Sequence, residues 1–151
     1  MKVVAIIQAR MSSTRLPGKV LKLASGRTML DRMLERVKKA RTISEVVTAT
    51  TTDPSDDSIA RACKKLGVSV FRGSLQDVLD RFYQASRMHQ ADIIVRLTGD
   101  CPLIDPALID DVVNALTRKK VDFACNRLPP PFSRTYPIGL DPNADIFALY
   151  A

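Results

Sequence analysis

The sequence predicts an α/β fold, a Rossmann-like three-layer sandwich with a mainly parallel sheet. Short runs of apolar and β-branched residues alternate along the chain with segments of helical period. The apolar runs are continuous, which is typical of strands buried on both faces of a sheet. The chain has 151 residues, 46% hydrophobic and 26% charged, which is enough for one domain with a substantial core. The repeated strand–helix–strand order then favours right-handed crossovers between parallel strands.

Five segments have the length and composition of strands: residues 3–7, 46–49, 68–71, 93–97 and 121–125. Between them, four stretches place apolar side chains on one helical face. These faces consist of Met29, Leu30, Met33, Leu34 and Val37; of Ile59, Cys63 and Leu66; of Leu75, Val78, Leu79 and Phe82; and of Leu108, Ile109, Val112, Val113 and Leu116. We therefore expect four helices that connect the strands.

Polar residues mark three of the expected helix starts. They are Ser55 before Asp56 and Asp57, Ser74 with Asp77 three residues on, and Asp105 with Pro106 after it. A short polar side chain at the N-cap accepts a hydrogen bond from a free amide of the first turn, and proline suits the first helical position.

The last part of the chain differs in composition from the rest. Residues 127–142 include Pro129, Pro130, Pro131, Pro137, Gly139 and Pro142. Proline lacks an amide donor, so this stretch cannot be a regular helix or a central strand. We expect residues 1–126 to form the α/β core. Residues 127–151 would be a proline-rich loop, either a lid or a fraying tail, and the start of a C-terminal segment within the same domain.

Composition narrows the classes of partner. Lysine and arginine exceed aspartate and glutamate by 23 − 16 = 7, which gives a net charge of +7. A chain with this charge attracts polyanions such as nucleotides, nucleic acid or anionic lipid. A nucleic-acid partner is disfavoured because only 5% of residues are aromatic and no basic helix carries interleaved stacking groups. No apolar run reaches the roughly 18 residues of a membrane span, and residues 3–7 are too short for a signal peptide. We expect a cytoplasmic protein without a membrane partner.

The cysteine and histidine residues indicate neither a disulfide or metal site nor a catalytic group. Cys63, Cys101 and Cys125 are far apart, with no CxxC or Cys/His pair, so neither a disulfide framework nor a zinc site is expected. Cys101 is expected to be a small buried side chain rather than a nucleophile. His89, the single histidine, is expected to be a surface or helix-end charge rather than a catalytic group.

The loop after the first strand, residues 8–19, has the composition of a phosphate-binding segment. It contains the cations Arg10, Arg15 and Lys19, the hydroxyls Ser12, Ser13 and Thr14, and Gly18. A triphosphate needs several cationic donors, short hydroxyl and amide donors, and a chain that can bend around it. The loop matches neither Walker A nor GxGxxG. The alternative is a solvated basic loop, but ligands of open α/β sheets bind at this end of the strands.

The loop after the fourth strand places one carboxylate, Asp100, where it can face the same crevice. Magnesium takes one or two protein carboxylates together with phosphate oxygens and water, so Asp100 is a candidate metal ligand. The alternative is a turn-forming aspartate after Gly99.

Two blocks of residues resemble a known family. Gln8-Ala9-Arg10 with Ser13-Thr14-Arg15-Leu16-Pro17-Gly18-Lys19 is similar to a nucleotide-binding signature, and Gly99-Asp100-Cys101-Pro102-Leu103 is similar to a metal-binding block. Further matches are residues 48–57, residues 71–82, Tyr136-Pro137 and Gly139-Leu140-Asp141. The chain thus resembles the acylneuraminate and 3-deoxy-manno-octulosonate cytidylyltransferase superfamily, closest to its spore coat polysaccharide biosynthesis protein F group, with the nucleotide-diphospho-sugar transferase type of fold.

The resemblance implies an enzyme that uses CTP and Mg²⁺ to activate an acidic sugar as a CMP-sugar, with release of pyrophosphate. It implies roles for nine residues: Arg10, Ser13, Arg15 and Lys19 on the triphosphate, Ala9 at the base through its backbone, Arg72 and Asp77 in the nucleotide pocket, and Asp100 with Asp141 on the metal. Of these, Arg15, Lys19 and Asp100 would take part in catalysis.

Two features depart from the family pattern. Relatives are generally longer, and their later portion supplies sugar contacts, a second metal carboxylate and often the interface of a homodimer. Ile138 stands where an acidic residue is frequent, and residues 142–144 separate Asp141 from Asp145. The alternatives are another nucleotide-sugar transferase of the same fold, or a truncated nucleotide-binding domain without catalysis. For Arg72 and Asp77, the alternatives are a strand-end cation and a carboxylate that favours the helix dipole.

Overall fold

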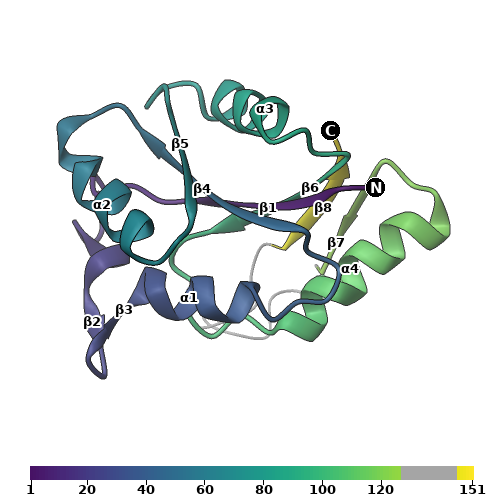
Figure 1. The fold of residues 1–151 in the computed structure, drawn as a ribbon, viewed down its shortest axis with the longest axis horizontal. Helices are drawn as coiled ribbons and strands as arrows, with labels where there is room; N and C mark the ends of the chain where they lie inside the picture. The colour runs from purple at the N-terminus through teal and green to yellow at the C-terminus, as the bar shows by residue number, and fades with distance from the viewer. Residues whose placement is uncertain (127–145) are drawn as a thin grey trace.

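The computed structural model describes residues 1–126 and 146–151, and its centre is a six-stranded sheet of order β5–β4–β1–β6–β8–β7 (Figure 1). The strands are β1 (Val3–Gln8), β4 (Glu45–Thr51), β5 (Ser69–Gly73), β6 (Ile93–Thr98), β7 (Phe123–Cys125) and β8 (Phe147–Tyr150). The five expected strands are all present. The expected proline-rich loop lies outside the described residues.

Parallel pairing dominates the sheet, as predicted. β1 pairs in parallel with β4 and β6, and Ala5 lies opposite Val46 and Val95. β8 is antiparallel to both of its neighbours, with Ala148 opposite Val95 and Ala124. β7 therefore runs in the same direction as β6. β8 was not predicted, because a four-residue strand next to a proline-rich segment has no local signal beyond its apolar side chains.

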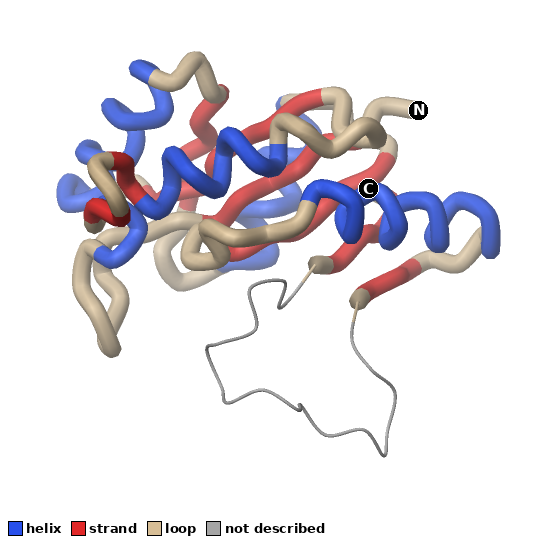
Figure 2. The backbone as a smooth tube through the Cα atoms, turned by 90° about the horizontal axis from the view of Figure 1, so that it is seen from below, coloured by secondary structure: helices blue, strands red, loops and turns tan. Residues whose placement is uncertain are grey.

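Four helices cover the two faces of the sheet (Figures 1 and 2). They are α1 (Met29–Val37), α2 (Asp57–Lys65), α3 (Val78–Met88) and α4 (Pro106–Lys119). The side chains of α1, α2 and α4 pack in one apolar cluster on one face, and those of α3 pack in a second cluster on the other face. The three-layer sandwich is confirmed. No helix within the described ranges is both long and apolar enough to cross a membrane.

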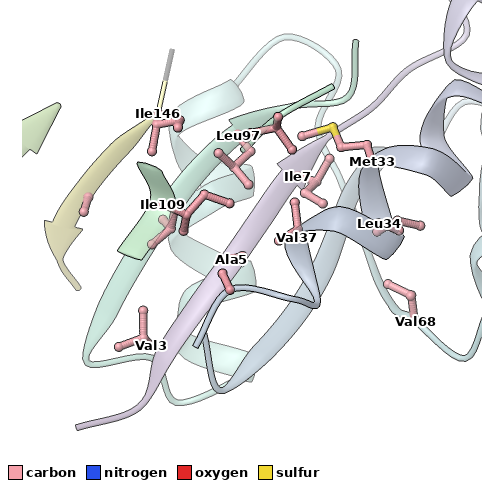
Figure 3. Close-up of a cluster of buried hydrophobic side chains, with 14 of the residues drawn as sticks. Val3, Ala5, Ile7, Met33, Leu34, Val37, Val68, Leu97, Ile109 and Ile146 are labelled. Carbon is pink, nitrogen blue, oxygen red and sulfur yellow. The ribbon is translucent and has the colours of Figure 1, made fainter. Parts of the chain in front are cut away.

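The core follows from the period-two alternation of β1. Val3, Ala5 and Ile7 belong to one buried cluster with Met33, Leu34 and Val37 of α1 (Figure 3). Val4 and Ile6 point to the opposite face, toward Phe82 and Ala85 of α3. All five residues of segment 3–7 are buried, as the continuous apolar run predicted.

The expected buried face of α3 was partly wrong. Leu79 is 81% exposed, whereas Arg81 is only 1% exposed. The helix begins at Val78, so the positions one helical repeat apart that face the sheet are Phe82 and Ala85, and Leu79 lies on the opposite side. Arg81 is adjacent to the buried stripe, which an apolar-only pattern does not reveal.

The helix caps are a mixture of confirmed and corrected predictions. Asp105 caps α4, since its carboxylate accepts from Ala107 N at 2.9 Å. Ser55 caps nothing: a short 3₁₀ turn, η2 (Pro54–Asp56), precedes α2, and Asp53 caps it by accepting from Ser55 N. Ser74 is not the N-cap of α3 either. The N-cap is Asp77, whose amide donates to Ser74 Oγ at 3.0 Å.

A small hairpin between β1 and α1 was not predicted. It consists of β2 (Leu23–Ala24) and β3 (Arg27–Thr28), and it follows the 3₁₀ turn η1 (Lys19–Leu21). Ser25 and Gly26 both have positive φ, 51° and 78°, as a type I′ turn requires. The Ser-Gly pair was the local signal, but the strands beside it are too short to show alternation.

Asp110 of α4 connects that helix to the segment between α1 and β4. Its carboxylate accepts from Arg41 N at 3.1 Å and from the amide and hydroxyl of Thr42 at 2.8 and 2.7 Å. Partial burial raises the pKa of Asp110, but the hydrogen bonds from Thr42 and Arg41 outweigh it and leave the pKa below its ordinary value.

We expect Asp110→Ala to lower the free energy of unfolding by about 1 kcal/mol at pH 7, after allowance for solvent screening. Because the pKa is lower in the folded state, this stabilisation should be complete above about pH 5 and disappear as the pH falls through the folded-state pKa. Urea unfolding across that range measures it. Asp111→Ala, an adjacent exposed carboxylate, is the matched control, and an equal loss in both variants would contradict the prediction.

Candidate functional site

The loops after β1 and β6 meet at the carboxyl edge of the sheet. Gly99 N donates to Gln8 O at 2.8 Å, and Ala9 N donates to Ala49 O at 3.1 Å. A Cβ on Gly99 would lie 3.0 Å from Gln8 O and 3.2 Å from Ala9 Cβ. The two loops that carry most of the predicted site residues are therefore in backbone contact, and glycine is the residue that permits it.

Lys19 and Asp100 form an ion pair between these loops. Partial burial raises the pKa of Asp100, but hydrogen bonds from Lys19 and Thr98 outweigh it, so the pKa lies below its ordinary value. The carboxylate is ionised at neutral pH, which is the state a metal ligand requires. The pair joins a residue expected on phosphate with a residue expected on metal, as the positions of the two loops predicted.

Met11 closes the phosphate-binding loop. Its carbonyl accepts from both Ser13 N and Gly18 N at 2.9 Å, and Gly18 has a φ of 68°. Arg10 and Arg15 are exposed, and within the described ranges neither guanidinium has a hydrogen bond or an ion pair. The loop thus presents two free cations at the sheet edge, together with the partly buried Ser13.

Arg72 lies on β5, opposite Thr50 of β4. Its Nε donates to Thr51 O at 2.8 Å, its Nη1 to Asp57 Oδ1 at 2.6 Å and its Nη2 to Asp53 O at 2.9 Å. Most of this guanidinium is engaged in holding β5 to the end of β4 and to the segment between β4 and α2. These contacts match the alternative of a strand-end cation, and a nucleotide contact by Arg72 stays a prediction.

Asp77 has a structural position as well. It is exposed, and its carboxylate accepts from Asp80 N at 2.8 Å as the N-cap of α3. A nucleotide contact would have to use the remaining lone pairs of this carboxylate, so that role also stays a prediction.

The metal site has one described candidate ligand. Asp141 lies outside the described residues. Within the described part of the chain, no group of three or more histidine, cysteine, aspartate or glutamate side chains is placed to hold a metal ion. A divalent ion at Asp100 would therefore draw its other ligands from substrate oxygens and water, as magnesium commonly does.

His89 lies away from the site, whereas Cys101 directly follows Asp100. His89 Nδ1 lies 2.8 Å from Glu45 Oε1, at the start of β4 and thus at the edge of the sheet opposite the site. Cys101 is partly buried, packs against the core and has its sulfur 3.7 Å from Thr98 Oγ1. The position of His89 is that of a helix-end residue away from the site, and the noncatalytic role of Cys101 stays a prediction.

Sequence reasoning missed Arg81. Its Nη1 donates to Ser74 O at 2.5 Å, while its Nε has no partner among the described residues. Burial lowers the pKa of Arg81, and the nearby charge of Arg10 lowers it further. An arginine within an otherwise apolar helical stripe was the available signal. The buried guanidinium adds positive charge near Arg10 of the phosphate-binding loop.

Sequence reasoning also treated Asp56 only as part of a helix start. In the structure it is a buried carboxylate whose oxygens accept from Met11 N and from Thr51. The side chain therefore holds the phosphate-binding loop at Met11 by a hydrogen bond. No pattern of residue spacing in the sequence predicts such a contact.

Known proteins match the chain over most of its length. The model of the cytidylyltransferase family matches residues 4–135. The spore coat polysaccharide biosynthesis protein SpsF of Bacillus subtilis is 43% identical over 114 residues, which cover 73% of this chain and 48% of SpsF. The 3-deoxy-manno-octulosonate cytidylyltransferase of Geobacter metallireducens is 40% identical over 118 residues, which cover 77% of this chain and 45% of that enzyme.

A solved structure is similar over almost the whole chain. The structure of a cytidylyltransferase from Leptospira borgpetersenii has a TM-score of 0.84 and 43% sequence identity, and the match covers 99% of this chain and 60% of that one. The chain spans about half the length of the relatives it matches. The family model covers most of the sequence, and relatives above 30% identity extend over more than two thirds of it. The chain belongs to the cytidylyltransferase family.

Proposed function

We propose that this protein is a nucleotidyltransferase that uses CTP and Mg²⁺ to activate an acidic sugar as its CMP-sugar, with release of pyrophosphate. The observation that carries the proposal is the contact between Lys19 and Asp100, because it joins the phosphate-binding loop to an ionised carboxylate. The likeness to SpsF favours a role in surface or spore-coat polysaccharide synthesis.

The reaction needs positioning and charge neutralisation rather than a covalent intermediate. A hydroxyl of the sugar would attack the α-phosphate of CTP in line, and pyrophosphate would leave. Arg10 and Ser13 would bind the triphosphate, and the backbone of Ala9 would meet the base. Bound Mg²⁺ would supply positive charge beside Asp100, which suits this hard cation because it is an ionised oxygen ligand with part of its surface open.

Arg15 and Lys19 would stabilise the leaving phosphates. Arg15 is exposed and free of described partners, so it can turn toward a ligand. Lys19 would exchange Asp100 for phosphate oxygens when a nucleotide binds. If these contacts strengthen as charge develops, they raise the rate; if they are equally strong in the ground state, they raise only the affinity.

Calorimetric titration with CTP, ATP, GTP and UTP, each with and without Mg²⁺, tests the proposal without knowledge of the acceptor. We expect selective binding of CTP that Mg²⁺ strengthens, followed by pyrophosphate release in a screen of sugar acids. Preference for another base would favour a different nucleotide-sugar transferase. Tight CTP binding without turnover on any sugar acid would favour a noncatalytic nucleotide-binding domain.

We expect Asp100→Ala to remove the gain in CTP affinity that Mg²⁺ provides and to reduce metal-dependent turnover at least about 100-fold. The fold should stay intact, because the side chain makes a partly exposed ion pair. Asp111→Ala removes an exposed carboxylate from α4 and serves as the control with the same change of charge. Full Mg²⁺-dependent activity in Asp100→Ala would refute the metal assignment.

We expect Gly99→Ala to destabilise the fold by about 1–3 kcal/mol and to weaken CTP binding. The new Cβ would press on Gln8 O and Ala9 Cβ and shift the backbone proposed to meet the base. Gly26→Ala is the control, because its Cβ meets no atom within 4 Å but its φ of 78° is strained. It should lose stability and keep its CTP affinity, as thermal unfolding and calorimetry will show.

A further inference from the structure

Asp56 is a buried carboxylate that the proposed mechanism does not use. Asp56 is 1% exposed and lies at the end of the η2 turn, directly before α2. Oδ1 accepts from Met11 N at 2.7 Å, and Oδ2 accepts from the amide and hydroxyl of Thr51 at 3.2 and 2.5 Å. A buried carboxylate is costly unless such donors surround it, and here the donors come from two separate segments.

Met11 is the residue through which this carboxylate reaches the site. Its amide is held by Asp56, and its carbonyl accepts from Ser13 N and Gly18 N. One peptide segment thus connects the carboxylate to the hydrogen bonds that close the phosphate-binding loop.

The other side of the carboxylate is anchored in the sheet. Thr51 is the last residue of β4 and is itself buried. The contacts from Thr51 to Asp56 and from Asp56 to Met11 therefore connect the phosphate-binding loop to the end of β4. Arg10 immediately precedes Met11, so the direction in which Arg10 leaves the sheet depends on the same contact.

We infer that Asp56 is a positioning residue for the nucleotide: through Met11, it holds the loop in the conformation that presents Arg10 and Ser13 to a triphosphate. The inference rests on the proposed function. A loop that is already in the binding conformation loses no affinity to rearrangement. Without the anchor, the competent fraction of loop conformations falls, and the dissociation constant rises in inverse proportion.

The test compares three variants of the full chain. Asp56→Ala removes all three accepted hydrogen bonds. Asp56→Asn retains an oxygen for Met11 N, and its amide can donate to the Thr51 hydroxyl although it loses the bond from Thr51 N, so it keeps the contact to the loop and serves as the conservative rescue. Leu116→Ala, in a buried position near the end of α4, lowers stability at the opposite edge of the sheet and serves as the control for general destabilisation.

Two measurements are made below the unfolding temperature of every variant: residue-resolved amide hydrogen exchange without ligand, and calorimetric titration with CTP and Mg²⁺. For Asp56→Ala we expect loss of protection at the Met11 and Gly18 amides and an increase of about tenfold in the dissociation constant for CTP. Asp56→Asn should stay within about threefold of wild type, as should Leu116→Ala.

The results separate this inference from the proposed function. Failure of the wild type to bind CTP would overturn the proposed function, and exchange at Met11 and Gly18 would still report whether Asp56 anchors the loop. Free exchange at Met11 and Gly18 with wild-type affinity for CTP, in either Asp56 variant, would overturn the positioning role. So would an equal loss of affinity in Leu116→Ala. If Asp56→Ala does not fold, Thr51→Val, which removes the hydroxyl that donates to Asp56, carries the test: we expect weaker protection at Met11 and a higher dissociation constant for CTP, and free exchange at Met11 with wild-type affinity would overturn the positioning role.

Discussion

Parallel pairing of β1 with β4 on one side and β6 on the other is the constraint on which the site depends. Because these strands run in the same direction, their following loops all emerge at one edge of the sheet. Gly99 N then donates to Gln8 O, and Asp56 reaches Met11 from the loop after β4. Three segments that are distant in sequence become a single polar surface for this reason.

The electrostatics of this edge are asymmetric. Arg10 and Arg15 have no described counterion, and Arg81 adds a buried charge nearby, whereas Lys19 is neutralised by Asp100. A polyanionic ligand would complete this arrangement, because it supplies the negative charge that the described protein groups lack. The excess of positive charge in the composition thus has a local counterpart at the edge where α/β proteins bind ligands.

The predicted site residues fall into two groups. Arg10, Arg15, Lys19 and Asp100 lie on the two loops that meet, and their positions follow from strand order alone. Arg72 and Asp77 are engaged in contacts with Asp57 and with the first turn of α3, which a resemblance of motifs cannot reveal. Strand and helix positions were predictable because apolar periodicity is a local property. The hairpin β2–β3, strand β8 and the exposure of Leu79 were not, since each depends on packing partners.

The sequence by itself determined the α/β architecture, the order of its elements along the chain and the composition of the two site loops. Continuous apolar runs can be satisfied only within a sheet covered on both faces, and clustered cations have few uses at a strand end. Only the tertiary structure decided that β8 lies between β6 and β7, that Arg81 is buried, and that the buried Asp56 contacts Met11 of the phosphate-binding loop. A buried charge is set by which donors and charges surround it in space, and spacing along a chain does not contain that information.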